Sequence, residues 1–173
     1  DDTAGDDPTG WVLTEPSGID IQVSTDQAKF DSKSVKYNDT SGSAIGKGNY
    51  AISKTKLRLL TWIYKVSTTD VSCYFPIYDE VLTASIYTAA INTGNFRYYD
   101  TAWHDIVSYS ASQWIRIEMV SVASNGDFNI KINDDWYNDK NIRGSPTTFD
   151  NFLIQTSTPQ IGTFYHDVVA IGK

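Results

Sequence analysis

Residues 114–133, WIRIEMVSVASNGDFNIKIN, predict two antiparallel strands joined by a tight turn. Apolar side chains alternate with polar or charged ones along 115–118 and again along 128–132. A period of two is typical of a strand that buries one face and exposes the other. The residues Ser-Asn-Gly-Asp at 124–127 supply the turn, because Asn and Gly accept the backbone conformations that tight turns need.

The same alternation recurs along most of the chain. Further strands are expected at 19–23, 35–37, 57–65, 71–78, 84–91, 96–99, 149–156 and 163–171. No segment shows the 3.6-residue period of an amphipathic helix. Roughly eleven to thirteen short strands predict an all-β fold. We expect an antiparallel two-sheet β-sandwich of the jelly-roll type, formed by residues 1–173 as a single domain.

Two further strand pairings are expected from the turns between the strands. Residues 57–65 and 71–78 are predicted to form a long hairpin around the polar turn at 67–70. Residues 84–91 and 96–99 are predicted to form a second hairpin around an Asn-Thr-Gly-Asn turn.

The composition excludes several classes of protein. Aromatic residues make up 13% of the 173 residues, too many for a disordered chain, and no apolar run is long enough for membrane insertion. The net charge is −7 with no basic cluster, so a nucleic acid partner is not expected. The single cysteine, Cys73, excludes an internal disulfide and lies in an apolar run that places it in the core.

Five segments, in this order and spacing, resemble the concanavalin A-like (laminin-G-like) jelly rolls. They are DDTAGDDPTGW at 1–11, SKSVKYND at 32–39, QWIRIE at 113–118, GDFNIKIN at 126–133 and FYHDVVAIG at 164–172. The resemblance covers nearly the whole chain and implies a jelly-roll domain of the lectin, glucanase or carbohydrate-binding-module type. The superfamily also contains polysaccharide lyases and interaction domains, and the fold alone does not choose among them.

Catalytic signatures of these relatives are incomplete in this sequence. The chain has only three Glu residues and lacks the ExDxxE arrangement of the related glucanases. Arg116 and Glu118 resemble the RxE strand of jelly-roll alginate lyases, but the companion motifs QIH and YxKxGxYxQ are missing. We expect Arg116 and Glu118 to form a salt-linked surface pair. The only histidines, His104 and His166, are candidates for acid-base chemistry if they meet this pair in a groove.

A sugar-binding sandwich needs exposed aromatic rings with polar groups beside them. If the predicted strands are neighbours, one sheet surface would gather Arg58, Trp62, Tyr64, Tyr74, Tyr78, Tyr87, Arg116 and Glu118, with Asn129 and Lys131 among them. A predicted edge loop at 98–105 adds Tyr99 and Trp103, and the segment 133–139 offers a similar cluster. The alternative is that Trp62 and Trp114 belong to the core.

Calcium is the metal that the resemblance implies. Related jelly rolls hold a structural calcium between the opening strand and an Asp of the closing strand, which here maps to Asp167. Asp2 and Asp31, or Asp1, would complete the site.

We therefore expect a non-catalytic carbohydrate-binding module, lectin-like, with a polysaccharide or glycan as partner and no other cofactor. The chain starts at Asp1 without an initiator Met, and we expect a domain excised from a larger extracellular or cell-surface protein. Two alternatives stay open: a polysaccharide lyase or glycoside hydrolase with an atypical site, and a protein-interaction or structural domain of a surface, adhesin or virion protein.

Overall fold

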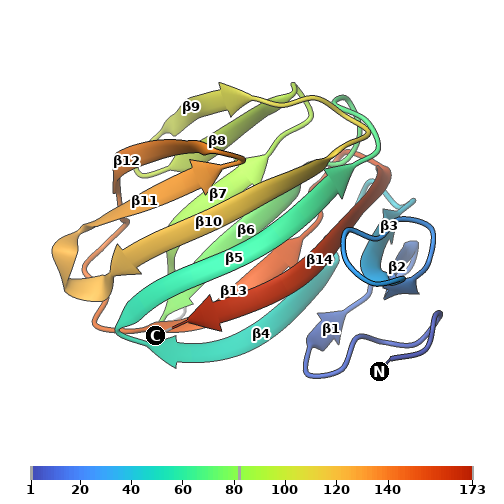
Figure 1. Ribbon diagram of the computed structural model, residues 1–173, viewed down its shortest axis with the longest axis horizontal. Helices are drawn as coiled ribbons and strands as arrows, with labels where there is room; N and C mark the ends of the chain where they lie inside the picture. Colours follow the sequence, from blue (N-terminus) through green and yellow to red (C-terminus); the bar gives the residue numbers. More distant parts are fainter. Residues whose placement is uncertain (1, 82, 173) are drawn as a thin grey trace.

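The computed structural model describes residues 2–81 and 83–172, and in this part of the chain two antiparallel sheets pack face to face (Figure 1). Sheet A has the order β1 (Val12–Thr14), β4 (Lys47–Lys54), β13 (Phe149–Gln155), β6 (Cys73–Asp79), β7 (Ala84–Ala90), β8 (Asn95–Tyr99) and β9 (Trp103–Ser108). Sheet B has the order β12 (Asp135–Asn141), β11 (Asp127–Ile132), β10 (Trp114–Val122), β5 (Lys56–Lys65), β14 (Gly162–Gly172), β3 (Ser34–Asp39) and β2 (Ile19–Ser24). The predicted all-β sandwich is confirmed.

Helical structure in the described residues is limited to a single 3-10 turn, Ala123–Asn125, between β10 and β11. None of the helical structure in those residues has the length and apolar character that crossing a membrane requires.

The hairpins predicted at 114–133 and 84–99 are both present. β10 pairs with β11, and Glu118 lies opposite Lys131. Gly126 closes their turn at φ 79°, a left-handed conformation that glycine adopts without strain. β7 pairs with β8, and Thr88 lies opposite Tyr98. In both cases a short turn sequence determines the partner, because it leaves the chain no room to reach another strand.

The hairpin predicted between 57–65 and 71–78 is wrong. β5 pairs with β10 and β14 in sheet B, whereas β6 pairs with β7 and β13 in sheet A. The residues between β5 and β6 therefore cross from one sheet to the other. Alternation along each strand correctly identified its buried face, but it carries no information about which strand lies alongside.

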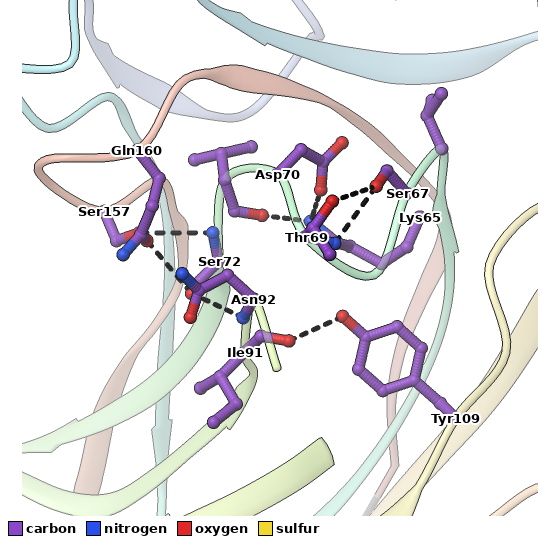
Figure 2. A network of polar contacts seen from close by, with 12 residues as sticks. Lys65, Ser67, Thr69, Asp70, Ser72, Ile91, Asn92, Tyr109, Ser157 and Gln160 are labelled. Carbon is purple, nitrogen blue, oxygen red and sulfur yellow. Dashed lines mark hydrogen bonds and ion pairs between the residues drawn. The ribbon is translucent and has the colours of Figure 1, made fainter. Parts of the chain in front are cut away.

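A buried ion pair fixes this crossover. The Lys65 ammonium group, which is fully buried, lies 2.6 Å from Asp70 Oδ1 and also donates to the Val71 carbonyl (Figure 2). It lies 5.8 Å from the centre of the Phe164 ring. Gly162 makes room for the pair, since a Cβ there would lie 2.6 Å from the Asp70 Cβ. A buried ammonium group needs such partners, because its desolvation is otherwise uncompensated.

Hydrogen bonds from three loops meet beside the ion pair (Figure 2). The Ser72 backbone N–H donates to Ser157 Oγ at 3.2 Å, and the hydroxyls of both serines donate to Gln160 Oε1. The Asn92 backbone N–H donates to Ser72 Oγ at 3.0 Å. The crossover after β5, the turn after β7 and the loop after β13 are thus held together at one end of the sandwich.

The inward faces of the two sheets share one hydrophobic core. Its members come from alternate strand positions and include Leu59, Ile63, Phe75, Ile77, Ile86, Ile115, Ile117, Met119, Phe128, Phe152 and Phe164. Cys73 is fully buried among them, as predicted, and burial raises the pKa of its thiol well above the usual value.

Removing one partner of the buried ion pair is predicted to destabilise the fold strongly. Asp70→Ala should lower the free energy of unfolding by about 3–5 kcal/mol, because it leaves the Lys65 ammonium group buried without a counter-charge. Urea denaturation measures the change. The control is Asp26→Ala, which breaks the more exposed Lys36–Asp26 pair at 2.7 Å and should lower the free energy of unfolding far less, because water screens an exposed pair. Equal losses in the two variants would contradict a structural role for the buried pair.

Candidate functional site

The aromatic residues predicted to share one surface lie on opposite outer faces of the sandwich. Trp62 and Tyr64 belong to β5 in sheet B, whereas Tyr74 and Tyr78 belong to β6 and Tyr87 to β7 in sheet A. The prediction of one common surface is therefore wrong. The reason is the crossover after β5, which turns the outward faces of β5 and β6 away from each other.

Four rings gather on the outer face of sheet A: Tyr74, Tyr87, Tyr99 and Trp103, here called the sheet A aromatic cluster. Tyr74 stacks on Tyr87 with 5.6 Å between ring centres and an interplanar angle of 22°. Trp103 lies 5.5 Å from Tyr87 and 5.3 Å from Tyr99. The rings come from the four adjacent strands β6 to β9, so the cluster runs across half of the sheet. All four were candidate residues, and sheet A is what brings them together.

Partial burial raises the pKa of two hydroxyl groups of this cluster. Burial raises the pKa of Tyr87 to about 12, and the neighbouring Tyr74 and Tyr78 add to the rise. Burial also raises the pKa of Tyr74. Tyr74 and Tyr87 therefore present neutral hydroxyls, which can both donate and accept hydrogen bonds. The exposed ring is Trp103, with 37% of its surface accessible.

Charged groups border the cluster, and one of them contacts a ring. Arg97 and Asp105 lie opposite each other on β8 and β9 and form an ion pair. The Arg143 guanidinium lies 5.0 Å from the centre of the Tyr99 ring, a cation–π contact. Rings with fixed polar groups at their margin are what a surface needs to recognise a ligand that has both C–H faces and hydroxyls.

The segment 98–105, expected to be an edge loop, is an ordered hairpin at the edge of sheet A. Asp100 in its turn accepts hydrogen bonds from the backbone N–H groups of Thr101 and Ala102 and from Asn141 Nδ2. These bonds, the Thr101 bond most of all, hold the pKa of Asp100 well below its usual value. His104 Nε2 lies 2.9 Å from Asp100 Oδ1. The turn therefore positions Trp103 on a firmly bonded edge strand.

On sheet B, the predicted platform Trp62 is covered. The Lys29 ammonium lies 4.4 Å from the centre of its ring, and Phe30 packs edge-on at 5.8 Å. Asp167 accepts the backbone N–H groups of Lys29 and Phe30 at 2.8 and 2.9 Å and so holds this segment over the sheet. Tyr64 packs between Trp114 and Tyr165, with ring-centre distances of 5.6 Å and 6.0 Å.

The predicted salt link between Arg116 and Glu118 is present, with Arg116 Nη2 2.9 Å from Glu118 Oε2, but Glu118 is buried, so the two residues are not the surface pair that was expected. Arg58 binds the other carboxylate oxygen at 3.0 Å. Neither histidine meets this group: His104 lies on the edge strand β9 of sheet A, and His166 is buried on β14. In residues 2–81 and 83–172, Arg116, Glu118 and a histidine therefore do not meet in one groove, which is the arrangement that would favour the lyase or hydrolase alternative.

The three aspartates predicted to bind calcium, Asp2, Asp31 and Asp167, do line one cavity of about 750 Å³. Asp1 lies outside the described residues. Both carboxylate oxygens of Asp2 accept hydrogen bonds from Thr9, and Asp167 is bonded to backbone amides. In residues 2–81 and 83–172, no three acidic, His or Cys side chains lie close enough to hold a metal ion. As placed, these carboxylates do not form a calcium ligand set, and calcium binding stays a prediction.

His166 lies beside the same cavity and is 3% exposed. The centre of its ring lies 5.1 Å from the ring centre of Trp11 and 5.6 Å from that of Tyr37. Neither ring nitrogen has a hydrogen-bond partner among the described residues. Burial lowers its pKa to about 3, because the charged imidazolium has nothing to replace water.

Some features of the site were missed by sequence reasoning. Arg97 is on the same outward face of its hairpin as Tyr99, and its alternation with that residue could have indicated it. Arg143 comes from the segment between β12 and β13, where no periodic pattern predicts its position.

No protein-family model and no curated protein matches the chain, but solved structures share its fold. A sialidase matches with a TM-score of 0.82 and 12% sequence identity over 95% of this chain and 17% of the sialidase. Endo-β-1,4-glucuronan lyase from the fungus Trichoderma reesei matches with a TM-score of 0.65 and 10% identity, over 98% of this chain and 93% of the lyase. A carbohydrate-binding module of the β-sandwich superfamily matches with a TM-score of 0.53 and 12% identity, over 99% of this chain and 62% of that chain.

The neighbours share the β-sandwich fold of this chain, so the resemblance to concanavalin A-like jelly rolls is confirmed at the level of the fold. The chain spans less than a fifth of the sialidase. Identities of 10–12% establish the fold alone, so the function must follow from the chemistry of the site.

The burial of His166 predicts a loss of stability in mild acid. The unfolded chain binds a proton near pH 6.5, whereas the folded protein keeps this ring neutral down to about pH 3. Above pH 6.5 the ring is neutral in both states, so its burial does not lower the free energy of unfolding. As the pH falls below 6.5, only the unfolded chain gains the proton, and the folded state loses stability relative to it. The free energy of unfolding should therefore drop by about 2 kcal/mol between pH 7 and pH 5, above the range in which carboxylates titrate.

Urea denaturation at pH 7, 6 and 5 measures this drop. His166→Phe, which places an apolar ring beside the cavity, should remove it, while His104→Gln on the surface should retain it. A drop that persists in His166→Phe would show that another group is responsible.

Proposed function

We propose that this domain is a non-catalytic carbohydrate-binding module that holds a poly- or oligosaccharide against the sheet A aromatic cluster. The observation that carries the proposal is the packing of Tyr74, Tyr87, Tyr99 and Trp103 on adjacent strands of one outer face. Aromatic rings bind the C–H faces of sugars, and the neutral tyrosine hydroxyls are suited to their hydroxyl groups.

The order of the site before binding supports this role. The rings contact one another, the Arg97–Asp105 ion pair borders them, and Arg143 covers part of Tyr99. Side chains held in this way lose little conformational freedom when a ligand arrives, which favours binding by a preformed surface.

The proposal is one of binding rather than catalysis. Tyr87 is the most shifted hydroxyl of the cluster, and its pKa of about 12 makes it a poor proton acceptor at neutral pH. Arg116 and Glu118 lie on the opposite sheet and are paired with each other.

The names of the structural neighbours support a glycan as the ligand, since one is a glucuronan lyase and another a carbohydrate-binding module. A polysaccharide ligand implies an extracellular or cell-surface setting. An open aromatic face binds with modest affinity, so the module would act while tethered to a catalytic or cell-surface domain that adds avidity.

Trp103→Ala should raise the dissociation constant for a neutral polysaccharide about tenfold or more. The reason is that a Trp that anchors a binding surface contributes about 2 kcal/mol. Affinity electrophoresis in gels cast with a panel of soluble neutral and acidic polysaccharides gives the dissociation constants. The matched control is Trp136→Ala, which removes a somewhat more exposed tryptophan from the edge of sheet B and should leave neutral polysaccharide binding unchanged.

Loss of retention in Trp136→Ala but not in Trp103→Ala would move the site to sheet B. Wild-type protein that no neutral polysaccharide retards would reject the proposal, and depolymerisation of the gel polymer would reject its non-catalytic part.

A further inference from the structure

A second cavity, of about 490 Å³, lies on the outer face of sheet B, on the opposite side of the sandwich from the sheet A aromatic cluster. Its lining comes from the four adjacent strands β5, β10, β11 and β12, which lie side by side in Figure 1. The lining residues are Arg58, Glu118, Val120, Asn129, Trp136 and Asn138. The volume lies in the range of small-ligand pockets.

The carboxylate in this cavity is already saturated. Glu118 is 4% exposed, and Arg58 Nε and Nη2 both lie 3.0 Å from its Oε1. Its Oε2 lies 2.9 Å from Arg116 Nη2. One negative charge thus holds two guanidinium groups, which leaves a net positive charge on the group and fixes the direction of Arg58.

The remaining hydrogen-bonding capacity of the cavity is dominated by donors. Arg58 uses Nε and Nη2 on Glu118, so Nη1 is left to donate outward, and its side chain is 66% exposed. Asn129 Oδ1 accepts the backbone N–H of Asp139 at 2.9 Å, which leaves its NH₂ group as a donor. A ligand that meets these groups must supply acceptors.

A tryptophan wall and a further cation stand beside these donors. Trp136 is 45% exposed on the edge strand β12. Lys131 on β11 lies between the two neighbouring strands, opposite Trp136 on one side and Glu118 of β10 on the other. The Lys131 ammonium is 5.9 Å from the centre of the Trp136 ring. The exposed indole can stack against the C–H face of a sugar ring, while Lys131 adds positive charge.

We propose that this cavity is a second binding site that takes the carboxylate of an acidic sugar, with the sugar ring against Trp136 and the carboxylate at Arg58 and Asn129. Arginine suits this role because its planar donors match carboxylate geometry. A local positive site is distinctive on a chain of net charge −7, which repels polyanions at long range. The site does not rest on the proposed function, since it shares no residue with the sheet A aromatic cluster.

The test uses affinity electrophoresis of the whole domain with polygalacturonate, its methyl ester, which has the same sugar backbone without charge, and poly-L-glutamate, which has carboxylates without sugar rings. We expect polygalacturonate to retard the protein and the other two polymers not to. Arg58→Gln and Trp136→Ala should each weaken this retardation about tenfold or more, and raised salt should weaken it further.

One control variant separates this site from a general loss of positive charge. Lys54→Gln removes the same charge from β4 in sheet A and should bind polygalacturonate like the wild type. Trp103→Ala, measured in parallel, reads any binding at the sheet A aromatic cluster. Trp136→Ala leaves the Arg58–Glu118–Arg116 group intact, so it tests the site even if Arg58→Gln unfolds. Circular dichroism and thermal melting check that each variant is folded.

Absence of wild-type retardation by polygalacturonate would overturn the proposal. Equal retardation by the methyl ester or by poly-L-glutamate, or full binding by folded Trp136→Ala, would do so as well. Loss of polygalacturonate binding in Trp103→Ala would assign acidic sugars to sheet A instead. The neutral polysaccharide panel reads the proposed function separately, so failure of one proposal is distinguishable from failure of the other.

Discussion

The buried ion pair between Lys65 and Asp70 is the constraint at the point where the two sheets of the sandwich connect. It sits where the chain leaves sheet B after β5 and enters sheet A before β6 (Figures 1 and 2). An ammonium group that is fully buried is stable only with its counter-charge and carbonyl partner in place, so the loop that supplies them has one acceptable path. That path separates β5 from β6 and commits their outward side chains to opposite faces.

Both candidate sites follow from this separation. Beyond the crossover, β6, β7, β8 and β9 succeed one another as hairpins, and each brings one ring of the sheet A aromatic cluster to the outer face of that sheet. On the other side, β5 lies beside β10, so Arg58 and Arg116 reach the same carboxylate on Glu118. A hairpin between β5 and β6 would have mixed the two sets of residues, and neither the ring cluster nor the two-arginine group would exist in its present form.

Much of the fold could be predicted from the sequence, because the signals involved are local. The period-two alternation identified most of the strands, but not β1, β4, β9 and β12. Short turns containing Asn and Gly identified the hairpins at 84–99 and 114–133. The partner of 57–65 could not be read in the same way, because pairing across a longer loop depends on contacts distant in sequence, such as Lys65 over Phe164. Four of the predicted site residues, Tyr74, Tyr87, Tyr99 and Trp103, do lie together, but their grouping with residues of sheet B depended on that pairing and was therefore wrong.

The most direct test of the sheet A site uses the five tryptophans as reporters, since they are distributed over both sheets and the N-terminal segment. Indole N–H signals in a ¹H–¹⁵N correlation spectrum would be followed during titration with an oligosaccharide cut from the polymer that retards the domain. We predict that the Trp103 signal shifts with saturation, while those of Trp11, Trp62 and Trp114 stay in place. A saturable shift at Trp62 or Trp114 with Trp103 unmoved would contradict a binding site on sheet A.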